Sequence, residues 1–140
     1  LNEIIAPNWP ANVYNVICGG NNNTIENSAN STIVGGNNNY VFVDNSFIGG
    51  GTYNTSTGIN STIGGGNQNY ISGDNSSILG GNQNTGYGLN ITIGGGDTNF
   101  VSGNYSSTAG GRLNQIRKSN GQSFIGGGSS NKICQLGWMK

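Results

Sequence analysis

Short stretches in which small polar and apolar residues alternate recur along the whole chain. Residues 31–33 and 61–63 both read Ser-Thr-Ile, and residues 76–78 read Ser-Ser-Ile. Alternation with a period of two and β-branched residues is typical of a β-strand. A second short strand is predicted around each member of another apolar series: Ile25, Val41, Ile71, Val101, Ile116 and Ile133. The three-to-four spacing of an amphipathic helix is not found anywhere in the sequence.

Glycine pairs set the period of this pattern. The pairs begin at Gly19, Gly35, Gly50, Gly65, Gly80, Gly95, Gly110 and Gly127. The steps between them are sixteen residues, then fifteen five times, then seventeen. Glycine permits the positive φ of tight corners, and fifteen residues suffice for two short strands and two turns. We therefore predict an all-β fold in which eight coils of about 15 residues stack into a parallel β-solenoid.

One asparagine follows each glycine pair at a constant distance. A residue that recurs in every coil lies above its counterpart at about 4.8 Å. Stacked asparagine amides can then bond to one another and to the turn backbone. The predicted ladder consists of Asn23, Asn39, Asn54, Asn69, Asn84, Asn99, Asn114 and Asn131. The next residue alternates between small and aromatic over six coils: Thr24, Tyr40, Thr55, Tyr70, Thr85 and Phe100.

The composition makes the predicted interior thin. Only 32% of the residues are hydrophobic, and there are 27 glycines. A typical coil offers one isoleucine and one other aliphatic residue, which is little apolar surface to set against the conformational entropy of fifteen ordered residues. We therefore expect one strand face to pack against symmetry copies, which makes the chain a homo-oligomer.

The charges are few and are divided between the two parts of the chain. All five acids precede residue 98 and all five bases follow residue 111, which argues against a nucleic-acid-binding surface. No eighteen-residue apolar run or signal peptide is evident, so we expect no membrane insertion by this segment. The chain begins with leucine and is interpreted as part of a longer or processed polypeptide. Cys18 and Cys134 are predicted to lie over about 30 Å apart, too far for an intrachain disulfide.

The residues that carry most enzyme chemistry are missing or scattered. The sequence has no histidine, and its acids fall on separate predicted coils. The glycine runs lack the Lys-Ser/Thr of a phosphate-binding loop and precede no helix. Asp44 and Asp74 occupy equivalent positions two coils apart and supply too few ligands for calcium. We expect no enzymatic activity, no cofactor and no protein-ligated metal.

Four surface features have both a structural and a functional interpretation. Seven Asn-x-Ser/Thr sequons either arise by chance from the Asn- and Ser-rich composition or are sites of N-glycosylation. The threonine column at residues 32, 62 and 92 either orders water, as on ice-binding solenoids, or has only a structural role in the strands. Phenylalanines interrupt this column. The aromatic column Tyr40, Tyr70 and Phe100 stacks on sugars or covers the outer sheet. Two extra residues within 115–122 predict a loop. The basic residues of this loop either bind anionic glycans or contact a following module. The candidate contact residues are Arg112, Arg117, Lys118 and Lys132.

The repeat unit resembles that of a known family. Residues 71–84, Ile-Ser-Gly-Asp-Asn-Ser-Ser-Ile-Leu-Gly-Gly-Asn-Gln-Asn, are similar to the YadA-like head repeats of trimeric autotransporter adhesins and to fibre repeats of phages and large viruses. The likeness covers residues 17–134. It implies a left-handed parallel β-roll, three intertwined chains and a role in attachment. Two cysteines, and Thr, Ser or Phe where the family commonly has Ala, favour a viral fibre over a bacterial adhesin.

The two ends depart from the repeat. Residues 1–16 contain two prolines unsuited to a ladder and are predicted to cap the first coil. Residues 135–140 form a second cap or begin another module. The leading hypothesis is a trimeric extracellular fibre segment, on a virion or tail fibre or alternatively a bacterial surface, that contacts a host glycan or receptor. A purely structural spacer is the second hypothesis, and a monomeric ice- or glycan-binding solenoid is the third.

Overall fold

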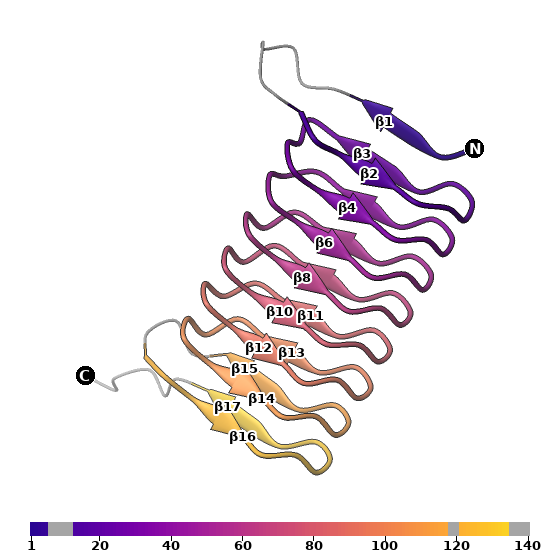
Figure 1. Ribbon diagram of the computed structural model, residues 1–140. Helices are drawn as coiled ribbons and strands as arrows, with labels where there is room; N and C mark the ends of the chain where they lie inside the picture. Colours follow the sequence, from indigo (N-terminus) through magenta and orange to yellow (C-terminus); the bar gives the residue numbers. More distant parts are fainter. Residues whose placement is uncertain (6–12, 118–120, 135–140) are drawn as a thin grey trace.

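The computed structural model describes residues 1–5, 13–117 and 121–134. All regular secondary structure in these residues is β: seventeen short parallel strands lie in two sheets that face each other (Figure 1). The chain winds from one sheet to the other in stacked coils from the N-terminal to the C-terminal end (Figure 1). The described residues include no helix with the length and hydropathy needed to cross a membrane. The predicted all-β solenoid of about eight coils is confirmed.

Odd- and even-numbered strands form separate sheets. The nine strands of sheet A are β1 (Glu3–Ile5), β3 (Thr24–Glu26), β5 (Tyr40–Val41), β7 (Thr55–Ser56), β9 (Tyr70–Ile71), β11 (Thr85–Gly86), β13 (Phe100–Val101), β15 (Gln115–Arg117) and β17 (Lys132–Cys134). The eight strands of sheet B are β2 (Val16–Ile17), β4 (Thr32–Ile33), β6 (Phe47–Ile48), β8 (Thr62–Ile63), β10 (Ser77–Ile78), β12 (Thr92–Ile93), β14 (Ser107–Thr108) and β16 (Phe124–Ile125).

The strand register reproduces the period of the sequence. In sheet B, Ile63 pairs with Ile78, and Ile78 pairs with Ile93. In sheet A, Tyr70 pairs with Thr85, and Thr85 pairs with Phe100. Each step is fifteen residues, so every residue of a coil lies beside its counterpart in the next coil. The backbone amides and carbonyls of the short strands are therefore satisfied between coils and not within them.

Each strand has a single position that points into the space between the sheets, because successive residues of a strand point to opposite faces, and in β11 that position is Gly86. Facing columns of aliphatic residues from sheets A and B form one cluster together with Ile91, which lies between β11 and β12. The cluster consists of Ile25, Ile33, Val41, Ile48, Ile63, Ile71, Ile78, Ile91, Ile93, Val101, Ile116 and Ile125. The interior is therefore one layer thick from each sheet, as the composition predicted.

The corner that leads from sheet B to sheet A contains the glycine pair, and we call it the glycine edge (residues 80–84 in one coil). Gly81 has φ +92°, and a Cβ added there would lie 2.2 Å from the carbonyl oxygen of Gly96. Successive coils approach too closely at this point for any side chain. A positive φ recurs two residues later, at Asn22, Asn38, Tyr53, Gln68, Gln83, Thr98, Leu113 and Ser130.

The opposite corner leads from sheet A to sheet B, and we call it the serine edge (residues 73–76 in the same coil). Ser46 donates to the carbonyl oxygen of Gly58 (3.1 Å), and its own amide donates to Ser31 Oγ (3.0 Å). Relative to the fifteen-residue coil, one extra residue lies between Ile25 and Ile33, and two lie between Ile116 and Ile125. Both insertions therefore fall at the serine edge. Part of the second, residues 118–120, lies outside the described residues.

Candidate functional site

No pocket opens in the described part of the chain, and none of its acidic, cysteine or histidine residues gather in groups of three that could hold a metal. Four surfaces run along the stack: the outer faces of sheets A and B, the glycine edge and the serine edge.

The asparagine ladder forms the inner side of the glycine edge and is buried. Asn69 represents it: its Nδ2 lies 3.1 Å from Asn54 Oδ1 and 3.0 Å from the carbonyl oxygens of both Gly65 and Gly81. Its backbone amide also donates to Asn54 Oδ1 (3.0 Å). One side chain thus links three coils. Asn23 to Asn114 are almost completely buried, and only Asn131, at the last described coil, is exposed.

The ladder has one more rung than the sequence analysis predicted. Asn2 Oδ1 accepts a hydrogen bond from the backbone amide of Asn23 (3.1 Å), and Asn2 Nδ2 donates to the carbonyl oxygen of Gly19 (3.0 Å). Strand β1 follows at once and pairs Ile4 with Ile25. A twenty-one-residue spacing and a missing glycine pair hid this rung. The tripeptide Asn2-Glu3-Ile4, which matches Asn23-Thr24-Ile25, was the available signal.

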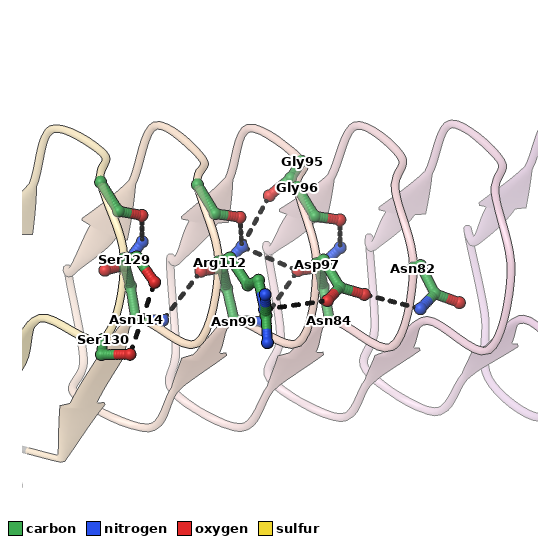
Figure 2. A network of polar contacts seen from close by, with 12 residues as sticks. Asn82, Asn84, Gly95, Gly96, Asp97, Asn99, Arg112, Asn114, Ser129 and Ser130 are labelled. Carbon is green, nitrogen blue, oxygen red and sulfur yellow. Dashed lines mark hydrogen bonds and ion pairs between the residues drawn. The ribbon is translucent and has the colours of Figure 1, made fainter.

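Arg112 belongs to a polar row on the outer side of the glycine edge. Asn67 donates to Asn82 (2.8 Å), and Asn82 donates to Asp97 Oδ1 (2.7 Å). Arg112 Nε lies 3.9 Å from Asp97 Oδ2 at the end of this row (Figure 2). The two charged side chains are 67% and 46% exposed, so this ion pair contributes little to stability. Arg112 therefore faces an acid of its own chain.

Two other predicted contact residues lie on the outer face of sheet A. Arg117 ends β15, and its guanidinium carbon lies 4.9 Å from the centre of the Phe100 ring. Lys132 begins β17, where it pairs with Gln115. Lys118 lies outside the described residues. The structure therefore brings Arg117 and Lys132 to one face and places Arg112 on the glycine edge.

Aromatic side chains are concentrated on the outer face of sheet A. The predicted column Tyr40, Tyr70 and Phe100 lies there, half-buried. Tyr87 packs between two of its members, with ring centres 5.6 Å from both Tyr70 and Phe100 and planes tilted by 53° and 52°. Phe42 stacks beside Tyr40 at 6.2 Å. The sequence analysis missed Tyr87 and Phe42, although both occupy the other outward position of their coil, two residues after the column.

The N-terminal part of this face is acidic. The Tyr40 hydroxyl donates a hydrogen bond to Glu26 Oε2 (2.8 Å). Burial, and then this hydrogen bond to a carboxylate, raise the pKa of Tyr40 to about 12. The Tyr40 hydroxyl is therefore held by Glu26 as a hydrogen-bond donor.

The outer face of sheet B has a different chemistry. Its strands present two outward columns, one residue before and one after each buried position, and none of these sixteen residues is charged. The first column is Val16, Thr32, Phe47, Thr62, Ser77, Thr92, Ser107 and Phe124, and the second is Cys18, Val34, Gly49, Gly64, Leu79, Gly94, Ala109 and Gly126. Val16, Val34, Phe47, Leu79 and Phe124 are exposed apolar residues of this face.

The two cysteines are free and exposed and mark different faces. Cys18 directly follows β2 of sheet B, and Cys134 ends β17 of sheet A.

Comparison with known proteins adds no relative: no family model matches the chain, and no curated protein matches it.

Proposed function

We propose that this chain is a segment of a homotrimeric extracellular fibre that attaches a particle or cell to its target surface. The observation that carries the proposal is the uncharged outer face of sheet B. Sixteen consecutive outward positions without one charge run the length of the stack, and large apolar residues among them are exposed. Depletion of charged residues together with exposed large apolar side chains is typical of protein interfaces.

A second copy of the same chain is the partner that this face fits. The face repeats with the same coil spacing as the stack, so identical copies can match it along its whole length. Small residues such as Gly49, Gly64 and Ala109 allow close approach. Three sheets B that meet around an axis would add a shared core to the single-layer interior of each chain, and sheet A would remain outside. The number three and a left-handed coil come from the resemblance to trimeric adhesin heads and viral fibres.

The choice of a viral or phage fibre rests on the same residues. The inward face of the trimer would carry Thr32, Phe47 and Ser77 where the adhesin family commonly has Ala, and the chain contains two cysteines. A bacterial adhesin head is the alternative with the same architecture.

A matched pair of lysine substitutions tests the assembly. Ser77 lies on the outer face of sheet B and Ser72 on that of sheet A, and both are half-buried. Because a buried unpaired ammonium is costly, Ser77→Lys should shift the mass measured by light scattering from three chains to one or cause unfolding. Ser72→Lys should leave a trimer. A wild-type mass of one chain at micromolar concentration would overturn the proposal.

The cysteines provide a second test, because the wild-type chain already carries one thiol on each face. In the proposed trimer Cys18 is covered and Cys134 is exposed, so a thiol reagent should modify Cys134 first and Cys18 only after denaturation. Cys18→Ser and Cys134→Ser variants assign the two rates. Equal rates in the native protein would contradict an interface on sheet B.

A further inference from the structure

One side chain per coil forms a continuous row along the C-terminal half of sheet A's outer face. We call Tyr70, Tyr87, Phe100 and Arg117 the aromatic row. Its rings are in contact at 5.6 Å, and the Arg117 guanidinium carbon lies 4.9 Å from the Phe100 centre. Tyr87 and Arg117 are exposed. The row is amphipathic and runs parallel to the stack.

Polar residues accompany the row in every coil. Each strand of sheet A has two outward positions, and the row alternates between them. The other position is occupied by a hydroxyl or amide side chain in the coils of Tyr70, Tyr87, Phe100 and Arg117, respectively Ser72, Thr85, Ser102 and Gln115. Ser72 and Thr85 are half-buried, and the Ser102 hydroxyl donates to the carbonyl oxygen of Ile116 (3.4 Å) while its lone pairs can still accept. Every ring therefore has a polar neighbour that can bond to a ligand lying on it.

The charge of the face changes along its length. Arg117 and Lys132 lie at the C-terminal end, whereas Glu3 and Glu26 lie at the N-terminal end. The two clusters of rings are separated by the coil of Thr55 and Thr57. Only the C-terminal cluster thus combines rings, hydroxyl groups and positive charge.

We propose that the aromatic row binds a linear polysaccharide that carries carboxylate or sulfate groups and lies along the fibre axis. The C–H face of a sugar ring packs on the negative face of an aromatic ring, and its hydroxyl groups bond to the accompanying polar residues. An anionic group pairs with Arg117, whose planar fork suits carboxylate and sulfate. This inference rests on the proposed attachment role and names its ligand class and its site.

Two other ligand classes fit the face less well. Single-stranded nucleic acid also stacks on aromatic rings, but it carries one phosphate per base, and proteins bind that backbone in a positively charged groove. This face has two bases in the described residues, and acids at its other end. A protein partner usually buries an apolar centre, whereas every ring here is flanked by a hydroxyl or amide.

The test is binding of the trimeric fibre to immobilised polygalacturonate and heparin, with dextran as a neutral polysaccharide and single-stranded DNA as a second polyanion. Wild type should bind one or both anionic polysaccharides and neither control polymer. Arg117→Gln should weaken binding about tenfold or more, the usual loss for a charged hydrogen bond. Tyr87→Ser should weaken it about threefold to tenfold, as expected for an aromatic contact.

Tyr105→Ser is the matched control. Tyr105 is exposed by 59%, similar to the 51% of Tyr87, but it lies on the serine edge. Its substitution should leave affinity unchanged. Light scattering and thermal melting on the same samples show whether each variant is folded and trimeric. Tyr87→Phe keeps the ring, so its circular dichroism spectrum and its affinity should both match those of wild type.

Each outcome decides a different point. A folded trimer that binds no anionic polysaccharide would overturn the inference and leave the fibre proposal in place as a spacer. Equal binding to dextran or to DNA, or an equal loss in Tyr105→Ser, would also overturn it. A monomeric wild type that still binds through Tyr87 and Arg117 would support the inference and refute the trimer.

Discussion

The glycine edge and the serine edge join the same strands, yet one is nearly invariant and the other is varied. Every glycine edge has a glycine with positive φ against the next coil and a ladder asparagine three residues later. Both insertions within residues 17–134 fall at the serine edge. The buried position of the serine edge is occupied by serine in most coils and by Ile91 in one. Stacking is thus controlled from one side.

The reason lies in what each edge bonds. At the glycine edge, each asparagine donates to the carbonyl oxygens of two turns and accepts from amides of a neighbouring coil. No other side chain of this length has the donors and the acceptor that this set of partners requires. At the serine edge, compensating pairs suffice. Ser56 replaces an aliphatic residue of sheet A and bonds to Ser61 in the same coil. Gly86 leaves a space in sheet A that Ile91 fills.

The largest difference between the edges is expected from Asn69→Ala compared with Ser76→Ala. Asn69→Ala leaves buried donors and acceptors of three coils without partners, which should cost about 4–6 kcal/mol of unfolding free energy. Ser76→Ala loses hydrogen bonds to Gly88 and Ile91 and should cost about 1–2 kcal/mol. Urea denaturation at one protein concentration measures both. Equal losses would show that the ladder does not dominate stacking.

Two adjacent glycines give the next contrast within the glycine edge. Gly81→Ala forces a Cβ against the Gly96 carbonyl oxygen at φ +92° and should cost about 3–4 kcal/mol. Gly80 has no atom within 4 Å of an added Cβ and no positive φ in the left-handed region, so Gly80→Ala should change stability by less than about 1 kcal/mol. Thermal melting of the two variants gives the comparison directly, and a tolerated Gly81→Ala would refute the close approach of coils.

At the serine edge, a substitution that creates a steric clash should be compensated by a second substitution in the residue it contacts. A Cβ on Gly86 would lie 2.4 Å from Ile91 Cδ1, the flexible end of that side chain. Gly86→Ala alone should therefore cost about 1–2 kcal/mol. Ile91→Val removes the clashing methyl group, so the double variant should recover most of the loss, although Ile91→Val alone costs about 1 kcal/mol. Additive effects in the double-mutant cycle would contradict a shared space.

The smallest effect concerns the outer side of the serine edge. Asp74 Oδ1 accepts the Ile59 amide (2.8 Å), and Asn104 accepts the Leu89 amide in the same way (3.0 Å). An amide oxygen is thus sufficient at this position. We expect Asp74→Asn to be neutral and Asp74→Ala to cost about 1 kcal/mol in chemical denaturation. A loss in Asp74→Asn would mean that the charge itself matters.

The same contrast explains how much could be predicted from the sequence. Glycine edges repeat the same residues, so coil number, strand register and the ladder from Asn23 to Asn131 followed from spacing alone. Serine edges repeat a looser pattern, and the Gly86–Ile91 compensation depends on distances that spacing does not contain. The outward neighbours Tyr70 and Tyr87 belong to different columns, so their contact was missed. Arg112 and Arg117 are five residues apart, but a turn separates the edge from the sheet face.

The constant offset between stacked residues also bears on how the chain folds. Nearly all contacts join residues about fifteen positions apart in 140, which corresponds to a relative contact order of roughly 0.1, a value usual for helical bundles. Closing each loop therefore costs little entropy, and order can begin at any coil and spread to its neighbours. For an all-β protein, acquisition of strand structure should be fast. In the proposed trimer, encounter between chains would then set a slow, concentration-dependent phase.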